Sequence, residues 1–261
     1  MRAGSRRPAA PAAFALFACL SCGPVLAEDL VTALSSNRVS IESNFTGAEI
    51  VLFGTIERDA QTVARRQGYD IVVVAKGPDQ ETIIRQKERI AGIWVNTSAR
   101  RFLNAPSYLA VLSNRPLENI APESALDRFQ LGLDRLILLQ PGHYAPETEN
   151  SAFKRALLRL MRRKDLYLEK ANGVTMLSSS LFLARIPLPA NVPVGTYHAE
   201  VYLFADGAML ERTDVEIFIR KSGSEAFLSR AAARYPFLYG VGAVIMALIS
   251  GWAANLIFRK D

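Results

Sequence analysis

Short stretches in which apolar and polar residues alternate recur between residues 39 and 219. A period of two is typical of a strand that buries one face. We predict strands at 39–42, 49–54, 69–75, 82–85, 90–95, 181–186, 197–203 and 215–219. The continuous β-branched run at 69–75 predicts a buried central strand, and Trp94 is expected to anchor the core. Residues 108–112 fit a strand or a short helix.

Turn residues suggest how some of these strands pair. Thr46-Gly47-Ala48 separates 39–42 from 49–54, which predicts a hairpin. Ala205-Asp206-Gly207-Ala208 predicts a second hairpin, between 197–203 and 215–219.

The spacing of apolar residues becomes helical in the middle of the chain. A first helix is expected after Pro122 and before Pro141-Gly142. Its apolar positions are Leu126, Phe129, Leu133, Leu136 and Ile137. A second helix is expected from about residue 150, with one apolar face and basic residues elsewhere. That face consists of Phe153, Leu157, Leu160 and Met161.

These elements predict a mainly β domain, an immunoglobulin-like β-sandwich. Residues 28–116 supply its first part, 117–178 form a helical insertion, and the hairpin region 179–222 completes it. The late strands fit either the same sandwich or a separate module, and we favour a single sandwich.

The longest uncharged apolar run, residues 237–258, predicts a transmembrane helix. At about 1.5 Å per residue it is about 33 Å long, enough for a hydrocarbon core of about 30 Å. Residues 223–236 form the linker before it and 259–261 a basic tail. Ala243, Ala247 and Gly251 share one helix face, which fits either packing against a second helix in a homo-oligomer or a plain anchor.

The first 27 residues have the arrangement of a secretory signal peptide. Arginines precede an apolar stretch at 12–20, and Val25-Leu26-Ala27 fits a cleavage site. Twin-arginine export and lipidation at Cys19 or Cys22 are weaker alternatives. Cleavage removes both cysteines and three arginines, which leaves 28 basic against 25 acidic residues, a net charge of +3. The remaining excess is too small to favour nucleic-acid binding.

Export and anchoring together predict a topology. The signal peptide carries the chain across the membrane, the apolar helix stops transfer, and Arg259 and Lys260 stay in the cytoplasm. In a bacterium the domain then lies in the periplasm, held at the inner membrane by a single span.

Several motifs carry a family resemblance. They include Gly77-Pro78, Gly92-Ile93-Trp94-Val95-Asn96, Ser107-Tyr108 and Ser113-Asn114-Arg115-Pro116-Leu117. With these motifs the chain resembles an uncharacterised family of alphaproteobacterial transmembrane proteins, over nearly its whole length. Genes of that family often lie near a permease similar to sulfite exporters. The resemblance therefore implies an accessory role in membrane transport, with that permease as the partner.

The chain has few residues in patterns suited to catalysis, so we expect that the protein is not an enzyme and binds no cofactor. His143 and His198 are the only histidines, and Pro146 separates His143 from Glu147, so no metal site is expected. No nucleophile elbow, phosphate loop or dinucleotide fingerprint is present. Ser178-Ser179-Ser180 fits a linker.

Arg85, Lys87 and Arg89 are two residues apart, so they share one face of an extended segment. Such a row can contact a partner protein or an oxyanion, or it can be a solvated face. The basic helix near 151–163 can likewise rest on headgroups or a partner, or be solvated. We favour an anchored interaction module without catalysis. The alternative is a binding module for a small anion, such as a sulfur oxyanion.

Overall fold

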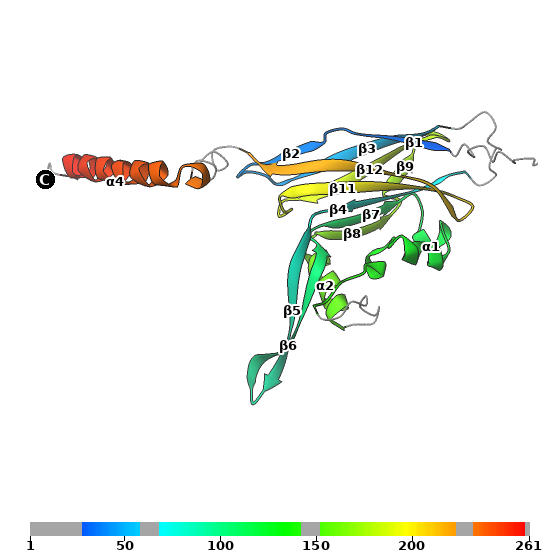
Figure 1. Cartoon of the computed structure of the whole chain (residues 1–261), viewed down its shortest axis with the longest axis horizontal. Coiled ribbons are helices and arrows are strands. Elements are labelled where there is room, and N and C mark those ends of the chain that lie inside the picture. Colours follow the sequence, from blue (N-terminus) through cyan, green and yellow to red (C-terminus); the bar gives the residue numbers. More distant parts are fainter. Residues whose placement is uncertain (1–27, 58–67, 142–151, 223–231, 259–261) are drawn as a thin grey trace, which may run out of the picture.

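A computed structural model describes residues 28–57, 68–141, 152–222 and 232–258. Two β-sheets pack together as a sandwich, a two-stranded arm projects from it, and a long helix lies at the C-terminal end (Figure 1). The strands of the sandwich are β1 (Asp29–Leu34), β2 (Arg38–Ile41), β3 (Gly47–Glu57), β4 (Asp70–Lys76), β7 (Leu109–Ser113), β8 (Tyr167–Ala171), β9 (Val174–Met176), β10 (Leu181–Pro189), β11 (Gly195–Ala205) and β12 (Ala208–Lys221). The prediction of a mainly β protein is confirmed. The finer immunoglobulin-like assignment stays a prediction.

Both sheets combine strands from the two ends of the domain. The four-stranded sheet has the order β1-β3-β10-β9, and the six-stranded sheet has the order β2-β12-β11-β4-β7-β8. β10 pairs with β3 along its whole length, and β11 pairs with β4. The late strands therefore complete the same two sheets that the early strands begin, and the hairpin of β11 and β12 forms as predicted.

The predicted hairpin between residues 39–42 and 49–54 is wrong. β2 pairs in parallel with β12 of the six-stranded sheet, whereas β3 pairs with β1 of the four-stranded sheet. The segment between β2 and β3 therefore crosses from one sheet to the other. Gly47, at a φ of +119°, stands where a Cβ would lie 2.9 Å from the carbonyl oxygen of Leu188, so close approach of the backbone fixes this crossing.

The core of the sandwich lies between the sheets and continues beneath the segment that follows β7. Residues 70–75 of β4 are all buried, as the continuous apolar run predicts. Phe129 packs against Tyr202 of β11, with 5.9 Å between the ring centroids. The segment 117–138 thus covers part of the outer face of the six-stranded sheet, where it buries Leu117, Ile120, Leu126, Leu131, Leu133 and Leu138.

The long helix predicted between Pro122 and Pro141 is replaced by shorter pieces. They are the 3-10 turns η1 (Leu117–Asn119) and η2 (Leu133–Arg135) and the short helix α1 (Glu123–Arg128). Gln130 and Gly132 have φ values of +53° and +123°, which end helical geometry after Phe129. Of the predicted apolar positions, Leu126, Leu133 and Leu136 are buried, Phe129 is half-buried and Ile137 is exposed. The backbone between them is not continuous helix.

Helix α2 (Ala152–Arg163) forms close to its predicted place. Its buried residues are Lys154, Leu157, Leu158 and Met161, whereas Leu160 is exposed. Lys154 is buried because its Nζ donates to the carbonyl oxygen of Asp134 at 2.7 Å. α2 lies in the connection between β7 and β8, which pair in parallel and so need a crossover. The region 117–178 thus contains β8 and β9 as well as helices.

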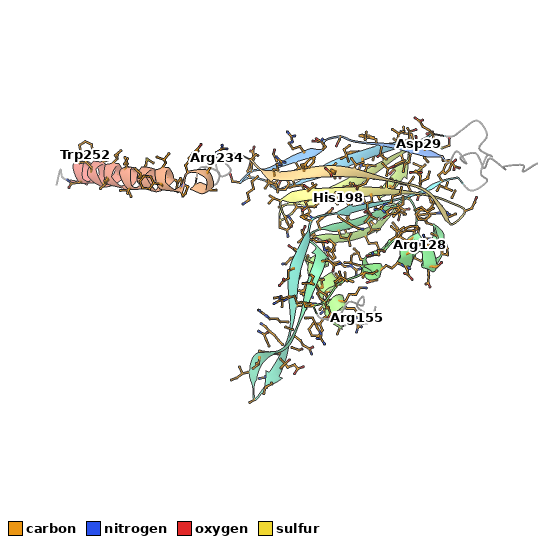
Figure 2. The ribbon with its side chains drawn as sticks, viewed as in Figure 1. Asp29, Arg128, Arg155, His198, Arg234 and Trp252 are labelled. Carbon is orange, nitrogen blue, oxygen red and sulfur yellow. The ribbon has the colours of Figure 1, made fainter. Side chains whose placement is uncertain are left out.

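Helix α4 (Pro236–Phe258) matches the predicted transmembrane segment. Over residues 236–255 it is long and apolar enough to span a membrane, and none of its most apolar window is buried against the rest of the protein. Arg234 lies just before it and Trp252 near its far end (Figure 2). The predicted signal peptide 1–27 and tail 259–261 lie outside the described residues.

Candidate interaction site on the hairpin arm

Strands β5 (Asp79–Ile90) and β6 (Ile93–Pro106) form a long antiparallel hairpin, here called the arm. It leaves the sandwich and extends well beyond it (Figure 1). Twelve residues of β5 at about 3.3 Å each give a length of about 40 Å. Ala91 and Gly92, with φ values of +49° and +86°, form the two-residue turn at its end.

Two predictions about the residues of the arm are wrong. The predicted strand 90–95 contains the turn, so its residues lie on two different strands. Trp94 is not a core anchor, because it is 66 % exposed near the end of the arm. The apolar pattern around Trp94 is real, but nothing in the described structure covers it.

The base of the arm is held by the rest of the domain. Ile84 and Phe102 are buried, and the guanidinium of Arg100 lies over the ring of Phe153 in α2 at 5.7 Å. The backbone N–H of Leu103 donates to the carbonyl oxygen of Leu139 at 2.9 Å. Burial raises the pKa of Asp79 at the start of the arm, and the positive charge of Lys76 opposes this shift. The base is therefore part of the folded body.

Within the described structure, the distal part of the arm has no such support beyond the contact of Arg100 with Phe153. Every residue from 85 to 101 is exposed, on both faces of the ribbon. An isolated two-stranded hairpin is only marginally stable in water, because it has no third layer on which to bury its side chains. The distal ribbon, defined as residues 85–101, is therefore the part of the domain with the least internal stabilisation.

The cation row lies on this ribbon. Cross-strand partners share a face, and Arg85, Lys87 and Arg89 lie opposite Ala99, Asn96 and Trp94. Ile84 and Arg100 belong to the opposite face, and Arg100 contacts Phe153 of α2. The row therefore faces away from this contact, and all three of its residues are exposed. Of its three cations, Arg89 donates from Nε to the carbonyl oxygen of Gly92 at 3.3 Å.

Two further residues of this face were missed by sequence reasoning. Arg101 lies opposite Ile83 and forms an ion pair with Glu81 at 3.2 Å. Trp94 lies directly opposite Arg89. The sequence feature that indicates this arrangement is Ala91-Gly92, a turn-forming pair between two stretches of alternating apolar and polar residues. Folding the sequence back at this turn brings Trp94 beside the cation row.

The tip of the arm, residues 90–95, carries apolar side chains on both faces. Ile90 and Ile93 are paired on the face opposite Trp94, and Val95 lies on their face. Ile93 is 69 % exposed, as much as Trp94. The tip is thus an apolar end on a ribbon whose next residues are cationic.

The other candidate residues show no comparable arrangement. His198 lies on the sandwich (Figure 2), where its Nδ1 is 3.0 Å from a carboxylate oxygen of Asp214. His143 lies outside the described residues. Among the described residues, no three metal-ligating side chains come together. The hydroxyl of Ser178 accepts from the backbone N–H groups of Ser180 and Leu181, so it stabilises a turn.

A polar network centred on Glu200 of β11 stabilises the sandwich. Glu200 accepts hydrogen bonds from the Tyr202 hydroxyl at 2.7 Å, from Arg212 at 2.7 Å and from Lys76 at 3.3 Å. Burial alone raises the pKa of this carboxyl. The hydrogen bond from Tyr202 and the charges of Lys76 and Arg212 outweigh burial, so the pKa of Glu200 lies below its ordinary value.

A cavity of about 670 Å³ opens at the seam between the two sheets. Its lining consists of Arg162, Asp165, Tyr167, Leu168, Glu169, Pro187, Leu188 and Pro189. The cation row is not part of this lining. Pro187 and Pro189 have no N–H group, and the Pro187 carbonyl accepts from the Tyr108 hydroxyl at 2.5 Å. This edge of β10 is therefore protected against pairing with another strand.

Ala243, Ala247 and Gly251 lie on α4, as predicted, and all three are exposed. Nothing lies within 4 Å of the position that a Cβ on Gly251 would occupy. The stripe is thus open to a lipid or to another helix.

Comparison with known proteins identifies a family. A family model described as "Putative transmembrane protein (Alph_Pro_TM)" matches residues 29–260. No curated protein matches the chain. Among solved structures, the sporulation control protein Spo0M from Bacillus subtilis is similar over 80 % of this chain at 11 % identity and a TM-score of 0.27. The match covers 56 % of that protein, and so low a TM-score establishes no shared fold. The family match covers nearly the whole sequence, and the chain belongs to this family of transmembrane proteins.

Proposed function

We propose that this protein is a membrane-anchored accessory module that works by binding another membrane protein, without catalysis. The single observation that carries the proposal is the distal ribbon of the arm. It extends away from a well-packed sandwich, exposes both faces, and presents three cations in a row. A partner surface would give this marginal ribbon the third layer that it lacks.

The cation row is the proposed contact with the partner. Arg side chains at interfaces form charge-assisted hydrogen bonds with carboxylates, and Arg is enriched among the residues that dominate binding energy. Arg85, Lys87 and Arg89 therefore favour a partner surface that carries acidic side chains. The family resemblance suggests a permease similar to sulfite exporters as that partner.

Capture of a small anion is less well supported. A binding site for a small molecule is normally a cavity that surrounds most of its ligand. The row instead lies on an open ribbon with solvent on both faces. The open geometry of the ribbon therefore favours an interaction module over an anion-binding module.

A photo-crosslinking side chain placed at Lys87 tests the proposal in cells. We expect it to capture one membrane protein in stoichiometric amount. The matched control carries the same crosslinker at Lys170, an exposed lysine at the edge of the sandwich. Equal capture from both positions, or no capture from Lys87, would show that the arm is not the contact element.

The proposed topology places the sandwich in the periplasm and the C-terminus in the cytoplasm of a bacterial inner membrane. The basic pair Arg259 and Lys260 supports this orientation. A reporter that is active only outside the cytoplasm should be active after Gly223 and silent after Asp261. Activity after Asp261 would reverse the orientation.

A further inference from the structure

The tip of the arm has a chemistry that the proposed partner contact does not use. Ile90, Ile93 and Val95 project from one face of the ribbon and Trp94 from the other. All four side chains are exposed. Exposed apolar clusters of this kind mark interaction sites, because isolated soluble domains rarely keep them in water.

We infer that the tip of the arm, residues 90–95, enters the interfacial region of the same bilayer that holds α4. A flat protein surface would cover one face of a two-stranded ribbon and leave the other in water. A fluid apolar medium covers both faces at once. The placement of apolar side chains on both faces of the tip therefore favours lipid as the occupant.

The residue types at the tip match the chemistry of the interface. Tryptophan is enriched at the boundary between lipid and water, where its ring is buried and its N–H stays near polar groups. Arg89, Lys87 and Arg85 follow directly behind the tip. Their long apolar stems let the charged ends reach headgroups while the neighbouring side chains are buried.

The charge of the distal ribbon supports the same location. Residues 85–101 contain five cations, Arg85, Lys87, Arg89, Arg100 and Arg101, and one acid, Glu88. The net charge is therefore 5 − 1 = +4 over 17 residues. A positive element next to an apolar tip is complementary to the surface of a membrane that contains anionic lipids.

The arm also begins at the end of the sandwich that leads to the membrane. Pro78, just before β5, lies against Gly195, and Gly195 pairs with Ile219 near the end of β12. Fourteen residues, 222–235, separate β12 from α4. An extended chain of that length spans at most about 50 Å. The base of the arm is thus within reach of the bilayer.

This inference rests on the proposed function only in placing the sandwich beside the membrane. It goes further in assigning the tip to lipid, which places the cation row at the level of the headgroups, where the surface of an embedded partner protein is also exposed. Insertion of the tip would give the sandwich a second attachment besides α4 and would fix the arm along the membrane surface.

The sequence offers a direct probe, because Trp94 and Trp252 are its only tryptophans. In the full chain with Trp252→Phe, all tryptophan fluorescence comes from Trp94. The variant is reconstituted into nanodiscs of phosphatidylethanolamine and phosphatidylglycerol, with or without bromine atoms on the acyl chains. We expect blue-shifted emission that brominated lipid quenches and aqueous iodide does not.

A matched variant defines the contribution of the tip. Adding Ile90→Ser and Ile93→Ser should shift Trp94 emission to the red and restore quenching by iodide. Exchanging phosphatidylglycerol for phosphatidylcholine should weaken quenching by the brominated chains. Circular dichroism of each variant checks that the β-rich fold is intact.

Water-like emission that iodide quenches and brominated lipid does not would overturn the inference. Blue-shifted emission without quenching by brominated lipid would also overturn it, since it indicates that protein, such as a second copy of the chain, covers Trp94. Both outcomes leave crosslinking from Lys87 in cells untouched, so failure of the inference is distinguishable from failure of the proposed function.

Discussion

The sandwich and the arm use the same kinds of residue in opposite environments. In β4, Ile71, Val72 and Val73 are fully buried between layers. At the tip of the arm, Ile93, Trp94 and Val95 are exposed. The difference lies in what covers each strand, not in local sequence. In this protein, apolar strand residues stabilise the fold in the sandwich and are available for binding in the arm.

The largest expected contrast is between one buried ring and one exposed ring. Phe182 of β10 is fully buried in the core, so Phe182→Ala should lower the free energy of unfolding by about 3–5 kcal/mol. Trp94→Ala should change it by no more than about 0.5 kcal/mol, because surface sites contribute little to stability.

Denaturant unfolding of the full chain in mild detergent measures both values. If Trp94→Ala destabilises the protein as much as Phe182→Ala, the arm is part of the cooperative core, and the distinction between the two regions is lost.

A close approach inside the sandwich gives the next largest effect. A Cβ on Gly54 of β3 would lie 2.2 Å from the ring of Phe182, which is itself fully buried and cannot move aside freely. We expect Gly54→Ala to cost about 1–3 kcal/mol through overpacking. Gly92→Ala in the turn of the arm meets no atom within 4 Å, although its φ of +86° is unfavourable for alanine. Melting curves should therefore show a large shift for the first variant and a small one for the second.

The Glu200 network makes part of the sandwich's stability depend on pH. The pKa of Glu200 is lower in the folded protein than its ordinary value of 4.5. The contribution of Glu200 to the free energy of unfolding is therefore present above pH 4.5. It is lost as the pH falls through the pKa that Glu200 has in the folded protein. At neutral pH, Glu200→Gln should cost about 1–3 kcal/mol, because the buried Tyr202 and the cations Lys76 and Arg212 lose a charged acceptor.

The difference in unfolding free energy between wild type and Glu200→Gln should shrink as the pH is lowered from 6 to 3. A difference that stays constant over this range would show that the charge of Glu200 does not stabilise the fold.

The smallest expected effect on the whole domain is in the turn of the arm. Ala91 has a φ of +49°, which costs an L-residue with a Cβ about 1–2 kcal/mol. Ala91→Gly should relieve this cost locally and slow amide exchange in the distal ribbon, with little change in the melting point. Hydrogen-exchange mass spectrometry separates the two readouts. Faster exchange in the ribbon would show that the strain is absent.

The sequence predicts the sandwich better than the arm, for a physical reason. Period-two alternation and the long run at 69–75 report burial directly, so most strands and α4 were found. The pairing of β2 with β12 was not predicted, because pairing between distant strands leaves no local mark. The continuous helix predicted between Pro122 and Pro141 is wrong because Gln130 and Gly132 adopt positive φ.

For the candidate site, the spacing of Arg85, Lys87 and Arg89 was enough to place them on one face. The sequence predicts Trp94 in the core, because a pattern of apolar residues shows that a side chain favours burial and does not show what buries it. Trp94 stays exposed because the turn at Ala91-Gly92 lies beyond the sandwich, where no other element covers the ribbon in the described structure.

The central claim is that the cation row of the arm serves binding and not folding. Its most direct test is Arg85→Gln combined with Arg89→Gln in the full chain. Arg159→Gln combined with Lys170→Gln is the matched control, because it removes two exposed cations from α2 and β8. We predict an unchanged melting point for both variants, and loss of the partner captured from Lys87 in the arm variant alone. A collapsed fold, or capture that persists without Arg85 and Arg89, would contradict the account.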